Sequence, residues 1–285
     1  MTALVRRDVA MPLLLLAVLL AGAIALPMLA ASDPRAMGDV LAQRFLPPMT
    51  TDAQGVFHLL GTDRFGRDIL TRTMLAARIS LVIGVLGSSL AGAAGIAIGA
   101  LAAWRGGFID RLLMGAADAL LAIPRLILLL VCAALWRPGA TTVIAVLVVT
   151  GWMAVARLVR AEVLGIRARP FVEAAAALGA TPPRILWRHV LPNALGPAIV
   201  AITLGVGGAI LLESGLSFLG LGVQPPQPSW GNMIADGRDA IVIAPWVALA
   251  PGLALIVTVV ASTLLGDALR DRLAGEGATT LRDRA

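Results

Sequence analysis

Three charged residues interrupt otherwise apolar stretches of the sequence, and they are its first candidates for chemistry. Asp118 and Arg125 stand seven residues apart, which in one continuous helix places them on a single face about 10 Å apart. Glu213 stands near the end of a later apolar stretch, just before a segment rich in Gly and Ser. A charge in lipid costs several kcal/mol unless it is paired or hydrated, so each side chain should have a partner or face a water-filled cavity.

The residue types leave two interpretations open for each charge. Asp118 and Arg125 either line a pathway for a solute beside the helix break at Pro124, or form structural pairs that hold their helix to its neighbours. Glu213 either binds a cationic group of a solute or hydrogen-bonds the loop that follows it.

The side chains of the common catalytic and metal sites are missing. His58 and His189 lie far apart in predicted loops, so they predict neither a metal cluster nor the Ser–His pair of an intramembrane protease. The single cysteine, Cys132, can form neither a disulfide nor a Cys-based metal site within the chain. All 23 basic residues are Arg, so the Lys of a Walker A loop is absent. We expect no catalytic residue, no metal site and no cofactor in this chain.

The elements that carry the three charges must be membrane-spanning helices. Hydrophobic residues make up 59% of the chain and charged residues 14%, whereas soluble domains are about half apolar and a quarter charged. Five stretches of about 20 apolar residues can each cross a hydrocarbon core as a helix, and a sixth is interrupted by charge. The stretches show no two-residue alternation, which favours helices over a barrel. The sequence therefore predicts an all-α integral membrane protein with six transmembrane helices.

The six predicted spans define the expected organisation of the chain. They cover residues 11–31, 78–103, 112–136, 141–164, 195–219 and 245–265. Residues 1–76 should hold the first helix and a long loop with little regular structure, residues 77–272 a five-helix core, and residues 273–285 a tail. The first helix also has features of a signal peptide that could be cleaved near Ala23, but its length favours a retained span.

Small residues recur along the second predicted span. One stripe has four-residue spacing and a second lies beside it; the stripes are Ala91, Gly95, Gly99 and Ala103, and Gly84, Ser88 and Gly92. Small residues at this spacing let helices approach closely in a membrane. The pattern predicts tight packing inside the bundle, and an interface with another subunit stays open as the alternative.

Arginine placement indicates the orientation of the chain. The net charge is +6, and because the arginines flank apolar stretches, we expect them to contact lipid headgroups rather than nucleic acid. With a cytoplasmic N-terminus, fourteen of the 23 arginines fall on the cytoplasmic side. The sequence therefore predicts that both termini are cytoplasmic.

A polar, Arg-rich segment at residues 165–192 separates two predicted spans. Pro170 suits the start of a short helix, and Gly179 is the residue expected where that helix ends in a left-handed conformation. Thr181 can cap a second short helix that stops before Pro192. The first helix has an alanine-rich face that suits a groove on another protein, whereas the alternative is an amphipathic segment on the bilayer surface.

The sequence of this segment resembles the cytoplasmic loop of binding-protein-dependent ABC permeases. The matching positions are Glu173, Ala174, Ala175, Gly179, Leu191 and Pro192, while His189 stands where the general pattern has Ile. In that family the loop forms the coupling helix that docks on the ATPase subunit. The resemblance therefore assigns coupling to the ATPase to these six positions.

Further motifs resemble the "C"-type permeases for dipeptides, oligopeptides and nickel. They follow one another in consistent order at residues 61–68, 188–193, 213–222, 228–231 and 265–267, and His189 fits this subfamily. The resemblance implies the type I ABC importer permease fold. It also implies ATP-driven import of peptides or a related small solute by alternating access, with a stand-alone secondary transporter as the alternative. The solute itself is left open.

The resemblance also implies a multi-subunit complex in the bacterial cytoplasmic (inner) membrane. The expected partners are a second permease subunit in a heterodimer, two ABC ATPase subunits that hold ATP and Mg²⁺, an extracytoplasmic substrate-binding protein and membrane lipid. No nucleic acid partner is expected. ATP hydrolysis is then expected from the partner subunits rather than from this chain.

Overall fold

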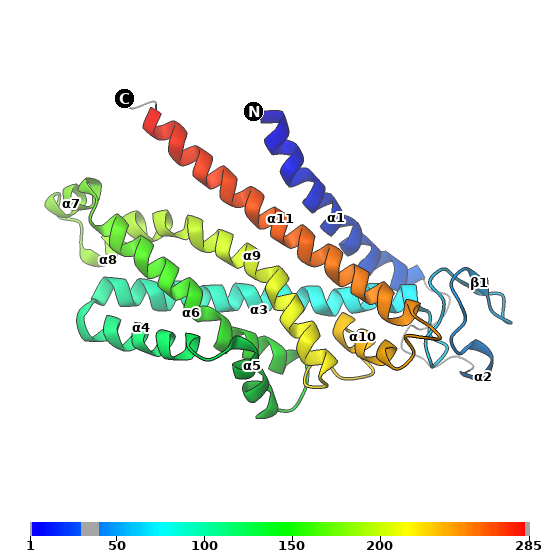
Figure 1. Cartoon of the computed structure of the whole chain (residues 1–285). Helices are drawn as coiled ribbons and strands as arrows, with labels where there is room; N and C mark the ends of the chain where they lie inside the picture. The colour runs from blue at the N-terminus through cyan, green and yellow to red at the C-terminus, as the bar shows by residue number, and fades with distance from the viewer. Residues whose placement is uncertain (1, 30–39, 283–285) are drawn as a thin grey trace.

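The computed structural model describes residues 2–29 and 40–282 of the 285-residue chain. Long helices dominate it (Figure 1): α1 (Thr2–Leu29), α3 (Ile69–Arg105), α6 (Ala140–Arg167), α9 (Leu191–Phe218) and α11 (Trp246–Arg282). The shorter elements are α2 (Val40–Gln43), β1 (Thr50–Thr51), β2 (Phe57–His58), α4 (Gly107–Leu121), α5 (Arg125–Ala134), α7 (Pro170–Ala177), α8 (Pro182–Ile185), a π-helical turn (Leu186–Val190) and α10 (Trp230–Arg238).

The helices form a bundle with two distinct ends (Figure 1). The β1–β2 hairpin, in which Thr50 pairs with His58, lies at one end together with α10; we call this the hairpin end. Helices α7 and α8 lie at the opposite end, and residues 165–192 are called the α7–α8 segment.

The long helices are apolar and long enough to cross a membrane. Five helices in the described part of the chain meet this condition, and the pair α4–α5, bent by 93°, makes a sixth if it counts as one broken span. With the bent pair included, the prediction of six spans is confirmed. The chain is a multi-pass membrane protein.

Both stripes of small residues on α3 serve close helix packing. A Cβ atom added at Gly95 would lie 2.7 Å from the Trp152 carbonyl oxygen on α6, and one added at Gly99 would overlap the backbone of Ala156. On the neighbouring stripe, a Cβ atom at Gly84 would overlap Ile210 of α9. The prediction of tight packing inside the bundle is confirmed for both stripes.

Helix α1 is joined to the bundle through two carbonyl groups near its C-terminal end, one of which a proline leaves without its helical donor. Pro27 has no amide to donate to the Ala23 carbonyl, four residues earlier. The guanidinium of Arg78 on α3 donates to this oxygen at 2.5 Å and to the Ile24 carbonyl at 2.9 Å. Arg78 therefore fixes the C-terminal part of α1 against α3.

Several predicted boundaries were wrong at the hairpin end. The second span begins at Ile69 instead of residue 78, because Asp68 accepts a hydrogen bond from the Thr71 amide at 2.8 Å and caps the helix. The expected boundary between residues 76 and 77 therefore falls inside α3. The loop predicted for residues 32–76 contains α2 and the hairpin in its described part, and the predicted end of the first span at residue 31 lies outside the described residues.

The predicted stop before Pro192 was also wrong. The chain continues from α8 through the π-helical turn into α9 without a break. Pro192 stands in the first turn of α9, where a helix tolerates a residue without an amide. The segment between the predicted spans 195–219 and 245–265 holds α10, and the last helix extends to Arg282 rather than to residue 265.

Candidate functional site

Helix α7 is held to the bundle by one side only. Val172 is buried in a hydrophobic cluster at the end of the bundle that holds α7 and α8, together with Ile185, Val190 and Leu191. Three other large apolar side chains of the segment face outward, since Phe171 is 42%, Trp187 68% and Leu178 88% exposed. The α7–α8 segment therefore presents an apolar surface that nothing in the described chain covers.

The six positions matched in the α7–α8 segment fall into two groups. Exposed positions are Glu173, Ala174, Gly179 and Pro192, whereas Ala175 is half-buried and Leu191 is buried. Glu173 stands in the first turn of α7, where a negative charge complements the helix dipole.

The ends of α7 agree with the sequence signals. The helix starts at Pro170, and Gly179 follows its last turn with a φ of +84° and open space around its Cα atom. The amides of Gly179 and Ala180 bond the carbonyls of Ala176 and Ala175. The predicted termination at Gly179 is confirmed, whereas Thr181 precedes α8 without a side-chain cap bond.

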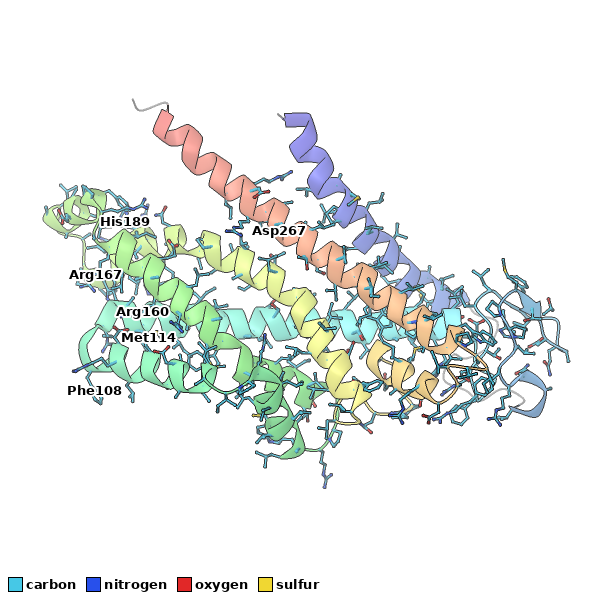
Figure 2. All side chains as sticks on the ribbon, viewed as in Figure 1. Phe108, Met114, Arg160, Arg167, His189 and Asp267 are labelled. Atoms are coloured by element: carbon cyan, nitrogen blue, oxygen red, sulfur yellow. The ribbon has the colours of Figure 1, made fainter. Side chains whose placement is uncertain are left out.

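Two arginines in the half of α6 that leads to the α7–α8 segment connect α6 to neighbouring helices, and both are labelled in Figure 2. Arg167 contacts α3, and Arg160 contacts α4. Arg167 lies over the Trp104 ring, 5.1 Å from its centroid, and donates to the Ala103 carbonyl at 3.2 Å. Arg160 holds both carboxylate oxygens of Asp110 on α4 at 2.5 and 2.6 Å. Sequence reasoning missed the Arg160–Asp110 pair, because its members are 50 residues apart and no local spacing links them.

The structure separates Asp118 from Arg125. Pro124 precedes α5 at the 93° bend between α4 and α5, so the two charges lie on different helices and the prediction of a shared face was wrong. Asp118 forms an ion pair with Arg157 of α6 at 3.3 Å, and both side chains are more than half exposed. This contact agrees with the structural interpretation of Asp118.

Arg125 lines a cleft of about 490 Å³ between α3, α6 and α9. Its guanidinium lies against α6, with Nη2 3.5 Å from a Cβ atom added at Gly151. Most other lining residues are small or apolar, including Gly87, Ala154 and Gly205. The arrangement agrees with the pathway interpretation of Arg125.

Glu213 lies in a buried hydrogen-bond network at the hairpin end. Its side chain is fully buried and accepts hydrogen bonds from the Ser217 hydroxyl at 2.6 Å and the Ser80 hydroxyl at 3.0 Å. The Ser217 hydroxyl in turn accepts a bond from the Val223 amide in the following loop. Glu213 therefore joins α9 to α3 and to the loop after α9, which agrees with the structural interpretation of this residue.

Trp230 closes this network from α10. The indole is fully buried and donates to the Thr73 carbonyl at 3.0 Å, while Ser229 caps α10 by accepting a bond from the Asn232 amide. A Cβ atom added at Gly231 would overlap the backbone of Ser214. The motifs at residues 213–222 and 228–231 thus pack against each other.

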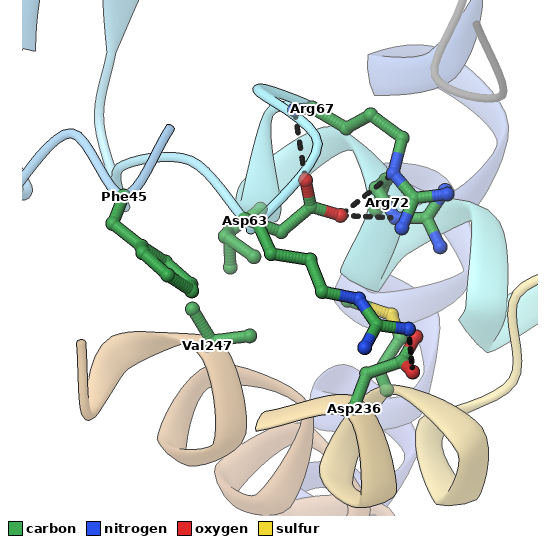
Figure 3. A pocket seen from close by; sticks show the side chains of 9 residues that line it. Phe45, Asp63, Arg67, Arg72, Asp236 and Val247 are labelled. Carbon is green, nitrogen blue, oxygen red and sulfur yellow. Dashed lines mark hydrogen bonds and ion pairs between the residues drawn. The ribbon is translucent and has the colours of Figure 1, made fainter. Parts of the chain in front are cut away.

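The motif at residues 61–68 forms an ion-pair cluster beside this network (Figure 3). Asp63 accepts a bond from Arg67 Nε at 2.6 Å and lies 3.6 Å from Arg72 Nε. Arg64 pairs with Asp236 of α10 at 2.9 Å. These contacts attach the loop before α3 to α10.

His58 lies between two carboxylates in the same region. Its Nδ1 is 2.9 Å from Asp68 and its Nε2 is 3.3 Å from Asp52. Burial raises the pKa of Asp52, but hydrogen bonds from the Val56 amide, from His58 and from the Gln54 amide outweigh it and hold that pKa below its ordinary value. Within residues 2–29 and 40–282, no three His, Cys, Asp or Glu side chains gather in a way that could hold a metal ion.

Comparison with protein families gives a match to binding-protein-dependent transport system inner membrane components over residues 95–275. A putative peptide transport system permease protein of Brucella suis biovar 1 (strain 1330) is 41% identical over 94% of this chain and 88% of its own length. The oligopeptide transport system permease protein OppC of Bacillus subtilis (strain 168) is 40% identical over 76% of this chain and 71% of its own.

Solved structures give the same fold. An inward-facing structure of the MetNI methionine ABC transporter matches with a TM-score of 0.56 and 22% identity, over 69% of this chain and 94% of that one. An amino acid ABC transporter solved with histidines matches with a TM-score of 0.53 and 18% identity, over 70% of this chain and 94% of that one. The fold prediction of a type I importer permease is confirmed.

Proposed function

The chain belongs to the family of binding-protein-dependent transport system inner membrane components, and from this premise we propose that it is one permease subunit of an ATP-driven importer of peptides or a related small solute. The observation that carries the proposal is the α7–α8 segment, which is fixed on one side and exposes apolar groups on the other. Such a surface suits a partner protein, because water-exposed apolar patches are costly unless they are covered.

The shape of the segment supports docking on an ATPase subunit. Val172 anchors α7, while Phe171, Glu173 and Leu178 point away from the core and can enter a groove on another protein. The six matched positions then have two roles. The exposed ones contact the ATPase, and Leu191 attaches the segment to the bundle.

The proposed importer contains subunits that this chain does not supply. A second, different permease completes the pathway, two ATPase subunits hold ATP and Mg²⁺, and an extracytoplasmic binding protein delivers the solute. This chain has no ATP site of its own and spans the bacterial inner membrane with both termini in the cytoplasm. ATP-driven closure of the ATPase pair moves the two coupling surfaces together, and the permeases alternate between two accessible states.

A double substitution in the α7–α8 segment tests the coupling role. We expect Glu173→Ala combined with Gly179→Val to reduce uptake by about tenfold or more at unchanged ATP turnover, because the contact surface and the end of α7 both change. Uptake and phosphate release are measured side by side on the importer complex in proteoliposomes. Asp239→Ala, at an exposed position of the hairpin end, is the matched control. Normal coupled uptake by the double variant would show that the segment does not couple.

Co-purification separates this function from that of a secondary carrier. The tagged chain, extracted in mild detergent, should bring down a second permease and ATPase subunits with Walker motifs, identified by mass spectrometry. A chain that purifies alone and still transports would be a stand-alone secondary transporter.

A further inference from the structure

The cleft beside Arg125 lies at mid-length of three spanning helices. Gly87 stands at the middle of α3, Gly151 near the middle of α6 and Gly205 near the middle of α9, and all three line the cleft. Because these helices cross the membrane, the cleft lies close to the centre of the bilayer. Lipid headgroups do not reach this depth.

Arg125 brings a positive charge into this cleft. Among the residues that the structure describes, no carboxylate lies within ion-pair distance of its guanidinium: Asp118 pairs with Arg157, and Glu213 is bonded to serines. A charged side chain near the bilayer centre is costly, and such residues mark solute pathways when no structural partner is present. Arg125 is therefore available to a ligand in the cleft.

A second cleft continues the first toward the α7–α8 end. It measures about 790 Å³ and shares Leu158, Ala201 and Leu204 with the first. Arg169 and Arg270 line it. Neither lining contains an Asp or Glu among the described residues, so the charged side chains of the combined wall are all arginines.

We propose that this wall is the chain's share of the solute pathway and that Arg125 binds the C-terminal carboxylate of the transported peptide. The inference rests on the proposed function and deepens it by naming the group that is recognised. A guanidinium donates two parallel hydrogen bonds to a carboxylate, and every unmodified peptide carries one such group at its C-terminus. Arg169 and Arg270 provide the next positive charges on the way to the cytoplasmic end. The opposite wall comes from the second permease.

Amidated peptides test the proposal. Uptake of one tripeptide is compared in its free-acid and C-terminally amidated forms, using the complete importer with its binding protein at saturating substrate. The variants are Arg125→Gln, Arg125→Lys and, as a matched control in the loop between α5 and α6, Arg137→Gln. The binding protein is the same throughout, so its own preference cancels when variants are compared.

We expect Arg125→Gln to slow uptake of the free acid by about tenfold or more and that of the amide by less than about twofold. Arg125→Lys should have a free-acid rate between those of the wild type and Arg125→Gln, because the charge remains but the two parallel hydrogen bonds are lost, and Arg137→Gln should change neither. An equal loss for both peptides would show a structural role and overturn the proposal, as would no loss for either. A wild-type importer that moves neither peptide would instead contradict the peptide function itself.

Discussion

The hairpin end and the α7–α8 segment both carry motif residues, but these residues lie in opposite environments. At the hairpin end, Glu213 and Trp230 are fully buried and bonded to residues of α3 that are more than 100 positions away. In the α7–α8 segment, Glu173 and Gly179 are exposed, and a Cβ atom added at Gly179 would meet open space. Motif residues of one chain therefore specify internal packing at one end of the bundle and an exposed surface at the other.

Two tryptophans give the largest expected contrast. Trp230→Ala removes a fully buried indole and its hydrogen bond to Thr73, and should lower the free energy of unfolding by about 3–5 kcal/mol. Trp187→Ala removes a side chain that is 68% exposed and should change stability by less than about 0.5 kcal/mol. Thermal unfolding in the same detergent compares them. Equal losses would mean that the two ends do not differ in packing.

Two glycines with positive φ give an intermediate contrast. Gly61 has a φ of +76°, and a Cβ atom there would lie 2.9 Å from Trp246 Nε1 and overlap the Leu46 carbonyl. Gly61→Ala should therefore cost about 2–4 kcal/mol, from backbone strain and overlap together. Gly179→Ala meets open space and should cost only about 1–2 kcal/mol for the backbone alone.

The glycine contrast is measured by thermal unfolding of each variant beside its parent. A Gly179→Ala variant at least as unstable as Gly61→Ala would show that crowding at the hairpin end adds nothing to the backbone cost.

The smallest expected effect is a change of stability with pH at the hairpin end, where Asp52 lies. Because the folded pKa of Asp52 lies below its ordinary value of about 4, the stability it contributes is complete above that ordinary value and is lost as pH falls through the folded pKa. Asp52→Asn should therefore be less stable than the wild type at neutral pH, and the difference should shrink on acidification. Unfolding curves at pH 7 and pH 3 measure it, and a difference that is constant with pH would contradict the assignment.

Local signals in the sequence were sufficient where a structure depends on its own residues. Pro170 and Gly179 correctly predicted both ends of α7, because a proline start and a left-handed glycine end act within one turn. The start of α3 was missed because its first turns contain Arg72 and Thr73, which look like loop residues. They are buried against the hairpin end, a contact that no local pattern reveals.

The roles of Asp118, Arg125 and Glu213 depend on contacts with other helices, which the spacing of residues in the sequence does not reveal. Asp118 and Arg125 share a face only in a straight helix, and the bend at Pro124 sends them to different neighbours. The serine partner of Glu213 on α3 is 133 residues away in the chain. Both assignments needed the tertiary structure.

The unbroken helix from Pro182 to Phe218 has a mechanical consequence. At about 1.5 Å per residue, this path of 37 residues is on the order of 50 Å long and connects the α7–α8 segment to the hairpin end of the bundle. If the α7–α8 segment docks as proposed, a displacement there reaches Glu213 and its serines through one continuous helix. The π-helical turn at Leu186–Val190, where the Leu191 amide bonds the Leu186 carbonyl, and Pro197 inside α9 are two irregular points of this helix where it can twist or bend.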